Sequence, residues 1–136
     1  LRVGWGYASK EIINSLNIVK PPFNINSPAL TAAEAAIKDN AWLKKEIKHV
    51  NKWNDKLYKE FQKLNIETNK SVTNFLLVKF DKIKKNSNKI FKLLASAGIL
   101  VRKMNSYGIK NSLRVTIGKS SENKKLILKI KKATNV

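Results

Sequence analysis

The sequence predicts that its C-terminal half folds as an α+β domain, in which helices cover a small and largely antiparallel sheet. The spacing of the apolar residues changes past Asn65, from the period of an amphipathic helix to the alternation of strands. From Ile66 onward the expected elements follow the order strand, strand, helix, strand, strand, helix. With 136 residues, of which 43% are hydrophobic, the chain is long enough to bury a modest core.

The first segment, "RVGWGYA", has strand character, and its first residues read as a buried strand that carries Arg2. Ser9 is placed to cap a short helix that runs to about Leu16. Pro21 and Pro22 then interrupt the chain, because proline lacks the N–H that a continuing helix needs.

Two further helices precede the sheet. Ser27 is the predicted cap of a helix with Pro28 at its first position, and the small apolar residues up to Ile37 predict that this helix is packed on several sides. A long amphipathic helix is predicted from about Ala41 to Leu64, because apolar residues recur there at helical spacing with lysines between them. These apolar residues are Leu43, Ile47, Val50, Leu57, Phe61 and Leu64.

The elements of the α+β domain are marked by alternation and by caps. Ser87 is the predicted cap of a helix that Gly98 ends, and Ser120 or Ser121 is the predicted cap of a last helix that runs to about Lys132. The expected strands are Ile66 to Thr68, Asn74 to Phe80, Ile99 to Arg102 and Leu113 to Ile117.

The composition excludes several classes of site. The chain has no cysteine, which excludes disulfides and thiolate zinc sites, and its single His49 is expected to be solvated or half-packed. No apolar run reaches the length of a membrane-spanning helix, and we expect a cytoplasmic protein. The net charge of +19 leaves open a basic nucleic-acid-binding module. However, the charge is spread along the chain without a block of like charges or an interleaved aromatic platform, which argues against nucleic acid as the partner.

The three arginines are the candidates for chemistry. The chain has 25 lysines and only three arginines, and a guanidinium binds carboxylate or phosphate through two parallel hydrogen bonds that an ammonium cannot imitate. In "LRVTI", alternation sends Arg114 to the face opposite the core. Arg102 ends the preceding strand, so the two guanidinium groups are placed to approach one anion, with the Tyr107 hydroxyl beside them. The alternative is that Arg2, Arg102 and Arg114 are ordinary surface residues.

Five segments stand in a familiar order and spacing: "LRVGWGYAS", "PPFN", "TNFLLVKF", "AGILVRKM" with "YG" just after it, and "LRVTIGKSSEN". In these segments the whole chain resembles the C-terminal part of the histidinol-phosphate aminotransferase family. That family belongs to class II of the fold-type I aminotransferases, which depend on pyridoxal 5'-phosphate. The resemblance implies an α/β protein overall: residues 1–40 end the large cofactor-binding domain, 41–64 form a connecting helix, and 65–136 form the small α+β domain.

The resemblance also implies a role for each arginine. Arg2 matches the residue that binds the phosphate of pyridoxal 5'-phosphate. Arg114 matches the residue that binds the carboxylate of the amino-acid substrate, and Arg102 matches one associated with the phosphate of histidinol phosphate. The implied substrates are histidinol phosphate and glutamate or 2-oxoglutarate, and the implied assembly is a homodimer.

The Schiff-base lysine of the family lies in a motif ahead of the position of Arg2, and none of the lysines here stands in a matching motif. We therefore expect a C-terminal fragment without a catalytic residue of its own, which does not catalyse transamination alone. The alternative within the superfamily is a sister aminotransferase for aromatic or other amino acids, in which Arg114 keeps its role and Arg102 binds no phosphate.

Overall fold

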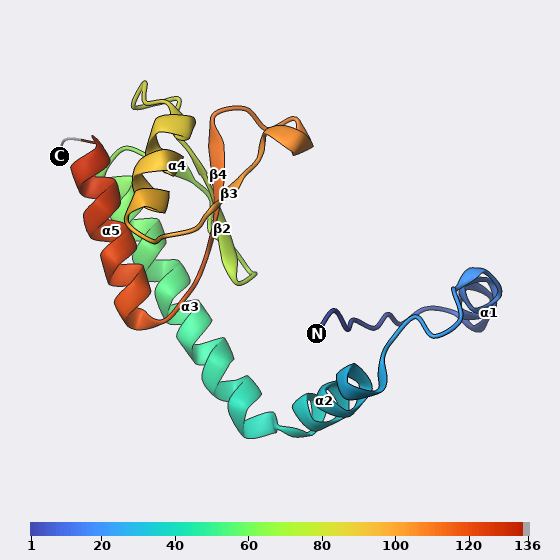
Figure 1. Cartoon of the computed structure of the whole chain (residues 1–136). Coiled ribbons are helices and arrows are strands. Elements are labelled where there is room, and N and C mark those ends of the chain that lie inside the picture. Colours follow the sequence, from blue (N-terminus) through green and yellow to red (C-terminus); the bar gives the residue numbers. More distant parts are fainter. Residues whose placement is uncertain (135–136) are drawn as a thin grey trace. The chain divides into compact units, whose positions relative to one another are not determined.

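A computed structural model describes residues 1–134 and divides them into two compact units. The first unit is Leu1–Lys44 and the second begins at Lys45. Figure 1 traces the course of the chain through both units. The domain limits expected from the resemblance, at residues 40 and 64, stay a prediction.

The first unit contains two helices, α1 (Lys10–Val19) and α2 (Ser27–Lys38), joined by the segment with the two prolines. Both lie where the sequence predicts helices, although α1 runs three residues beyond Leu16. The cap of α2 is Asn26, not the predicted Ser27, because the Asn26 side chain accepts a hydrogen bond of 2.9 Å from the backbone N–H of Ala29.

The strand predicted at the start of the chain is not formed, and that prediction was wrong. Residues 1–9 have no regular secondary structure, and Leu1, Trp5 and Tyr7 are largely exposed. A strand persists only where its N–H and C=O groups pair with a neighbour. Among the described residues of the first unit no second strand offers that pairing.

The second unit is the predicted α+β domain, and its four-stranded sheet is antiparallel throughout. The strand order is β1-β2-β4-β3, so the central ladder joins β2 to β4. The elements are α3 (Asn40–Lys63), which begins before the unit boundary, β1 (Glu67–Thr68), β2 (Phe75–Lys79), α4 (Ser87–Ser96), β3 (Arg102–Lys103), the short 3-10 helix η1 (Asn105–Tyr107), β4 (Ser112–Thr116) and α5 (Ser120–Thr134).

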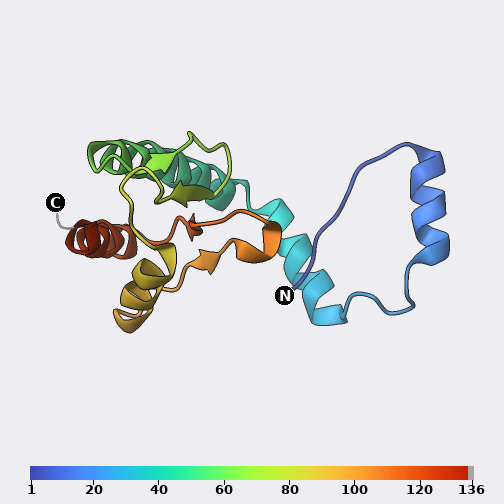
Figure 2. The same ribbon diagram turned by 90° about the horizontal axis from the view of Figure 1, so that it is seen from above.

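The core of this unit lies between one face of the sheet and a layer of three helices. In the helix layer α5 lies between α3 and α4, as the view from above shows (Figure 2). Alternation along β2 and β4 turns Leu76, Val78, Leu113 and Val115 toward the helices, and these buried side chains form one side of the core. The strand residues of the core are Leu76, Val78, Leu113 and Val115, and the helix residues are Trp53, Leu57, Phe61, Ile90, Leu94, Leu126, Ile127 and Ile130.

Two predicted helix caps of the second unit are replaced by neighbouring groups. Asn86, not Ser87, caps α4, since its side chain accepts from the backbone N–H of Asn88 at 2.8 Å. At the start of α5 the Glu122 carboxylate accepts from the backbone N–H of Lys119 at 2.7 Å, which is one half of a capping box. The predicted cap Ser120 instead accepts a hydrogen bond from the indole N–H of Trp53, at 3.0 Å.

Smaller differences concern the strands and the apolar stripe of α3. The strand expected from Ile99 to Arg102 forms a ladder only at Arg102–Lys103. Leu43 and Ile47 of the predicted stripe are about half exposed. Gly98 does end the turn after α4, with a φ of +74° in the left-handed region that glycine adopts without strain.

A cluster of charges ties α3 to α5. The Glu60 carboxylate lies 2.8 Å from the ammonium of Lys131 on α5 and 2.8 Å from that of Lys63 one turn along α3. Hydrogen bonds from Lys131 and then Lys63 favour the ionised form and lower the pKa of Glu60 from its ordinary value of 4.5 to about 2. A carboxyl whose pKa is lower in the folded state stabilises the fold at a pH above its ordinary value.

We expect Glu60→Gln to lower the free energy of unfolding at pH 7 by about 1 kcal/mol, because both lysines are partly exposed to water. The difference from the wild-type chain should disappear as the pH falls from 4.5 towards 2, where Glu60 becomes protonated in the folded state too. Urea unfolding at several pH values measures it. Glu34→Gln, which removes an exposed ion pair with Lys38, is the control and should have little effect. A loss for Glu60→Gln that is constant with pH would contradict the electrostatic account.

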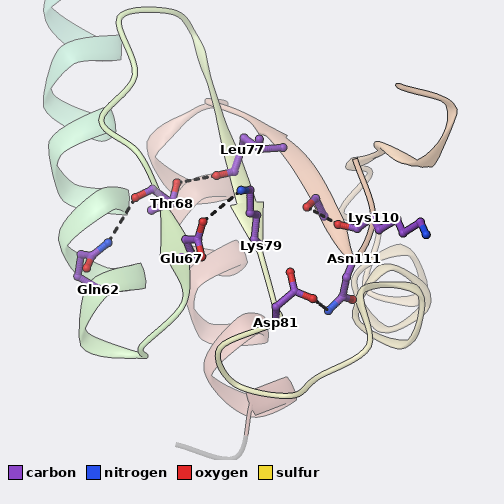
Figure 3. A network of polar contacts seen from close by, with 9 residues as sticks. Gln62, Glu67, Thr68, Leu77, Lys79, Asp81, Lys110 and Asn111 are labelled. Carbon is purple, nitrogen blue, oxygen red and sulfur yellow. Dashed lines mark hydrogen bonds and ion pairs between the residues drawn. The ribbon is translucent and has the colours of Figure 1, made fainter. Parts of the chain in front are cut away.

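Asn111 connects the start of β4 to the loop before α4. Its side-chain oxygen accepts from the backbone N–H of Ser87 at 2.8 Å, and its amide donates to the Lys85 carbonyl at 3.0 Å and to Asp81 at 2.9 Å. Figure 3 shows Asp81 and Asn111 facing each other. The φ of Asn111 is +47°, a left-handed conformation that asparagine tolerates better than most residues. The residue is therefore specified by both its backbone and its amide.

Asn111→Ala should destabilise the chain by about 2 kcal/mol, because it leaves the N–H of the buried Ser87 without an acceptor and strains the backbone. Asn105→Ala is the matched control, since Asn105 is exposed on η1, and its cost should stay below about 0.5 kcal/mol. Equal midpoints in chemical denaturation for the two variants would show that the network contributes nothing.

Candidate functional site

The face of the sheet that looks away from the helices carries the polar residues of β4. Leu113 and Val115 are buried in the core, whereas Arg114 between them is half-buried on the opposite face, as the alternation predicts. Leu77 of β2 is the direct cross-strand partner of Arg114. The guanidinium therefore stands on the central ladder of the sheet, on a rigid element.

The sheet brings Arg102 next to Arg114. The two residues are Cα partners in the β3–β4 ladder, so their side chains leave the same face of the sheet. Like charges directly opposite each other destabilise an antiparallel pair. A bound anion would remove that repulsion and accept hydrogen bonds from both side chains, so the pair is suited to an anionic ligand.

Arg102 is exposed and interacts with Tyr107 of η1. Its Nη2 donates a hydrogen bond of 2.6 Å to the Tyr107 hydroxyl, and its guanidinium carbon lies 5.1 Å from the centre of the Tyr107 ring. The left-handed Gly108, with a φ of +73°, turns the chain directly after η1. The loop thus brings a hydroxyl to the arginine pair, as the sequence predicts.

Arg114 has a different environment. Its Nε is buried and has no hydrogen-bond partner, and its guanidinium carbon lies 4.9 Å from the centre of the Phe75 ring. Sequence reasoning missed Phe75. The signal was available, because alternation in "NFLLVKF" puts Phe75, Leu77 and Lys79 on the face that carries Arg114.

Arg2 belongs to the first unit, Leu1–Lys44. Its side chain is exposed and its φ is +64°, a conformation that is uncommon outside glycine. Arg2 and Trp5 line a shallow hollow together with one side of α2. The α2 residues of the hollow are Ala29, Ala32, Ala33, Ala36 and Ile37. Its lining is mostly small and apolar, and Arg2 is its charged residue.

The contacts of His49 are with other residues of the fold. Its Nε2 lies 2.9 Å from the carbonyl oxygen of Gly118, and its ring is half-buried near Trp53. Within residues 1–134, no group of three or more metal-ligating side chains gathers. Within the same residues, no helix combines the length and the apolar character needed to cross a bilayer.

Comparison with known proteins identifies the family. The family model described as "Aminotransferase class I and II" matches residues 1–130. The chain belongs to this aminotransferase family.

Individual aminotransferases agree with this assignment. The chain is 43% identical to the histidinol-phosphate aminotransferase of Pelagibacter ubique, over 99% of this chain and 38% of that protein. It is 42% identical to the histidinol-phosphate aminotransferase of Campylobacter jejuni, over 97% of this chain and 35% of that protein. The chain therefore spans little more than a third of the length of these relatives. The resemblance stated from the sequence is confirmed.

Solved structures confirm the fold class. The histidinol-phosphate aminotransferase of Clostridium acetobutylicum superposes with a TM-score of 0.78 at 24% identity, over 93% of this chain and 38% of that one. The enzyme of Sinorhizobium meliloti, solved in complex with pyridoxal-5'-phosphate, superposes with a TM-score of 0.76 at 18% identity, over 90% of this chain and 33% of that one. The fold of this chain is thus shared with part of these fold-type I aminotransferases.

Because the pair of Arg102 and Arg114 is suited to an anion, we expect inorganic phosphate to stabilise this chain. At a concentration ten times the dissociation constant the gain is about 1.4 kcal/mol, measured by thermal unfolding against chloride at equal ionic strength. Arg102→Gln should abolish that gain, because it removes one of the two guanidinium groups of the pair. Lys110→Gln removes the same charge from an exposed position outside the pair and should keep the gain. An unchanged phosphate effect in Arg102→Gln would exclude the pair as the binding site.

Proposed function

We propose that this chain forms the C-terminal part of a pyridoxal-phosphate-dependent aminotransferase that acts on histidinol phosphate in histidine biosynthesis. In the proposed reaction the amino group passes between histidinol phosphate and 2-oxoglutarate, with glutamate as the other amino compound. The observation that carries the proposal is the cross-strand pair of Arg102 and Arg114, in a chain 43% identical to a histidinol-phosphate aminotransferase. Both proposed substrates of such an enzyme are anions, and they bind in turn.

Each arginine of the pair has a proposed task. Arg114, half-buried on the central ladder, binds the carboxylate of glutamate or 2-oxoglutarate. Arg102, exposed and next to the Tyr107 hydroxyl, binds the phosphate of histidinol phosphate. A rigid strand position holds each substrate in one orientation, which lowers the entropic part of the barrier.

The residues around Arg2 fit the phosphate end of the cofactor. Arg2 has no hydrogen bond or ion pair within the described residues, so its guanidinium is available to a dianion. Trp5 and the small residues of α2 offer apolar surface beside it. When bound, pyridoxal 5'-phosphate supplies a conjugated ring that stores the electron pair left when the substrate loses a proton. We propose that Arg2 fixes the phosphate and thereby orients that ring.

The remaining parts of the proposal concern the whole enzyme. We propose that the chain alone is inactive, because no lysine here matches the family's Schiff-base motif, so the covalent step has no nucleophile. We also propose that the enzyme works in the cytoplasm as a homodimer, on small-molecule substrates.

The test replaces the matching C-terminal segment of the Pelagibacter ubique enzyme by this chain and assays the chimera with histidinol phosphate and 2-oxoglutarate. The chimera should be active and this chain alone inactive. Arg102→Lys should raise the KM for histidinol phosphate about 10- to 100-fold, the cost of a lost charge-assisted hydrogen bond. Lys110→Ala is the control. A preference of the chimera for phenylalanine would contradict the proposed substrate, and an Arg102→Lys variant with wild-type KM would contradict its role.

A further inference from the structure

The buried Nε of Arg114 is the one buried polar atom of the arginine pair that has no partner among the described residues. A buried donor without an acceptor costs about 1–3 kcal/mol, so such an atom in a stable sheet needs a compensating interaction. The contact recorded for this side chain is with the ring of Phe75, whose centre lies 4.9 Å from the guanidinium carbon. A cation facing an aromatic ring within about 6 Å is attracted by the ring's electrons, more strongly where water is excluded.

The register of the sheet explains how the two residues meet. Leu77 is the direct partner of Arg114, and Phe75 stands two residues before Leu77, on the same face. Such diagonal neighbours on adjacent strands lie within reach of aromatic and long side chains. Phe75 is itself half-buried and belongs to the central ladder, so the ring is held as firmly as the arginine.

The contact matters because a like charge stands next to Arg114. Arg102 lies directly across the β3–β4 ladder, and its repulsion favours any conformation that moves the Arg114 guanidinium away. The Arg114 side chain forms no hydrogen bond or ion pair within the described residues, so no polar partner opposes that movement. The Phe75 ring opposes it, while it leaves the terminal guanidinium nitrogens free for a ligand.

We propose that Phe75 is a positioning residue that holds Arg114 in its carboxylate-binding conformation. The proposal rests on the proposed function, in which Arg114 binds the substrate carboxylate. Phe75 does not touch the reacting atoms. It holds the guanidinium in place before the substrate arrives, so that binding does not have to immobilise a long side chain.

The first test uses the 136-residue chain and does not depend on enzyme activity. The chain contains three arginines, so its NMR spectrum contains three Nε–Hε signals, and the Arg114 signal is the one that Arg114→Lys removes. In the wild-type chain this proton should exchange slowly with water and carry a ring-current shift from Phe75. Phe75→Leu should abolish the ring-current shift and speed the exchange about tenfold, whereas Phe75→Tyr, which keeps a ring, should keep both features.

The matched control is Phe91→Leu. The Phe91 ring also faces a cation, the ammonium of Lys103 at 4.6 Å, but it lies on α4 and is not in contact with Arg114. This variant should leave the Arg114 signal unchanged. The backbone amide spectrum shows whether each variant folds. If Phe75→Leu does not fold, the Phe75→Tyr signal and the wild-type exchange rate still decide the question.

The second test measures catalysis in the chimera with the Pelagibacter ubique enzyme. Phe75→Leu should raise the KM for 2-oxoglutarate about tenfold with little change in kcat, and Phe75→Tyr should restore it. A general structural defect would instead lower kcat for both substrates. Wild-type exchange and KM in a folded Phe75→Leu variant would overturn the inference. An inactive chimera whose Arg114 signal still depends on Phe75 would refute the proposed function and leave the contact intact.

Discussion

The antiparallel ladder between β2 and β4 is the constraint on which both the core and the candidate site depend. Its register sets Leu76 against Val115 on the face that the helices cover, and Leu77 against Arg114 on the other face. A slip of one residue would send Arg114 into the core and Val115 to the surface. The hydrophobic residues that stabilise the fold therefore also determine which way the arginine faces.

The end of β4 is held by polar contacts that reach the helix layer. The Gly118 carbonyl oxygen lies 2.9 Å from the Asn123 amide nitrogen and 2.9 Å from His49, while the Gly118 N–H donates to Asn123 at 3.0 Å. Asn123 lies on α5 and His49 on α3, so one peptide group is tied to both helices. These contacts fix the chain just after β4. The half-buried guanidinium of Arg114 is therefore held in place.

The sequence was sufficient where one residue's chemistry decides the structure. Alternation in "LRVTI" placed Arg114 correctly, and Gly98 ended α4 because few other residues adopt its conformation freely. It was insufficient where several groups compete. Ser87 has the right chemistry for a cap, but Asn86 stands one position earlier and takes the role. The first strand was predicted from local composition, although a strand depends on a partner that local composition does not reveal.

The charges of the site and the Tyr107 hydroxyl beside them were predictable, whereas the contact of Arg114 with Phe75 was not. A chain with 25 lysines and three arginines marks its arginines as the places where a planar fork is needed. This imbalance selected Arg2, Arg102 and Arg114, and the sheet brings the last two together. It did not identify Phe75, because an aromatic residue in a strand is first explained by packing. The two arginines have different environments. The exposed Arg102 forms a hydrogen bond with a hydroxyl, whereas the half-buried Arg114 packs against an aromatic ring. Two arginines that differ in this way are suited to two different anions.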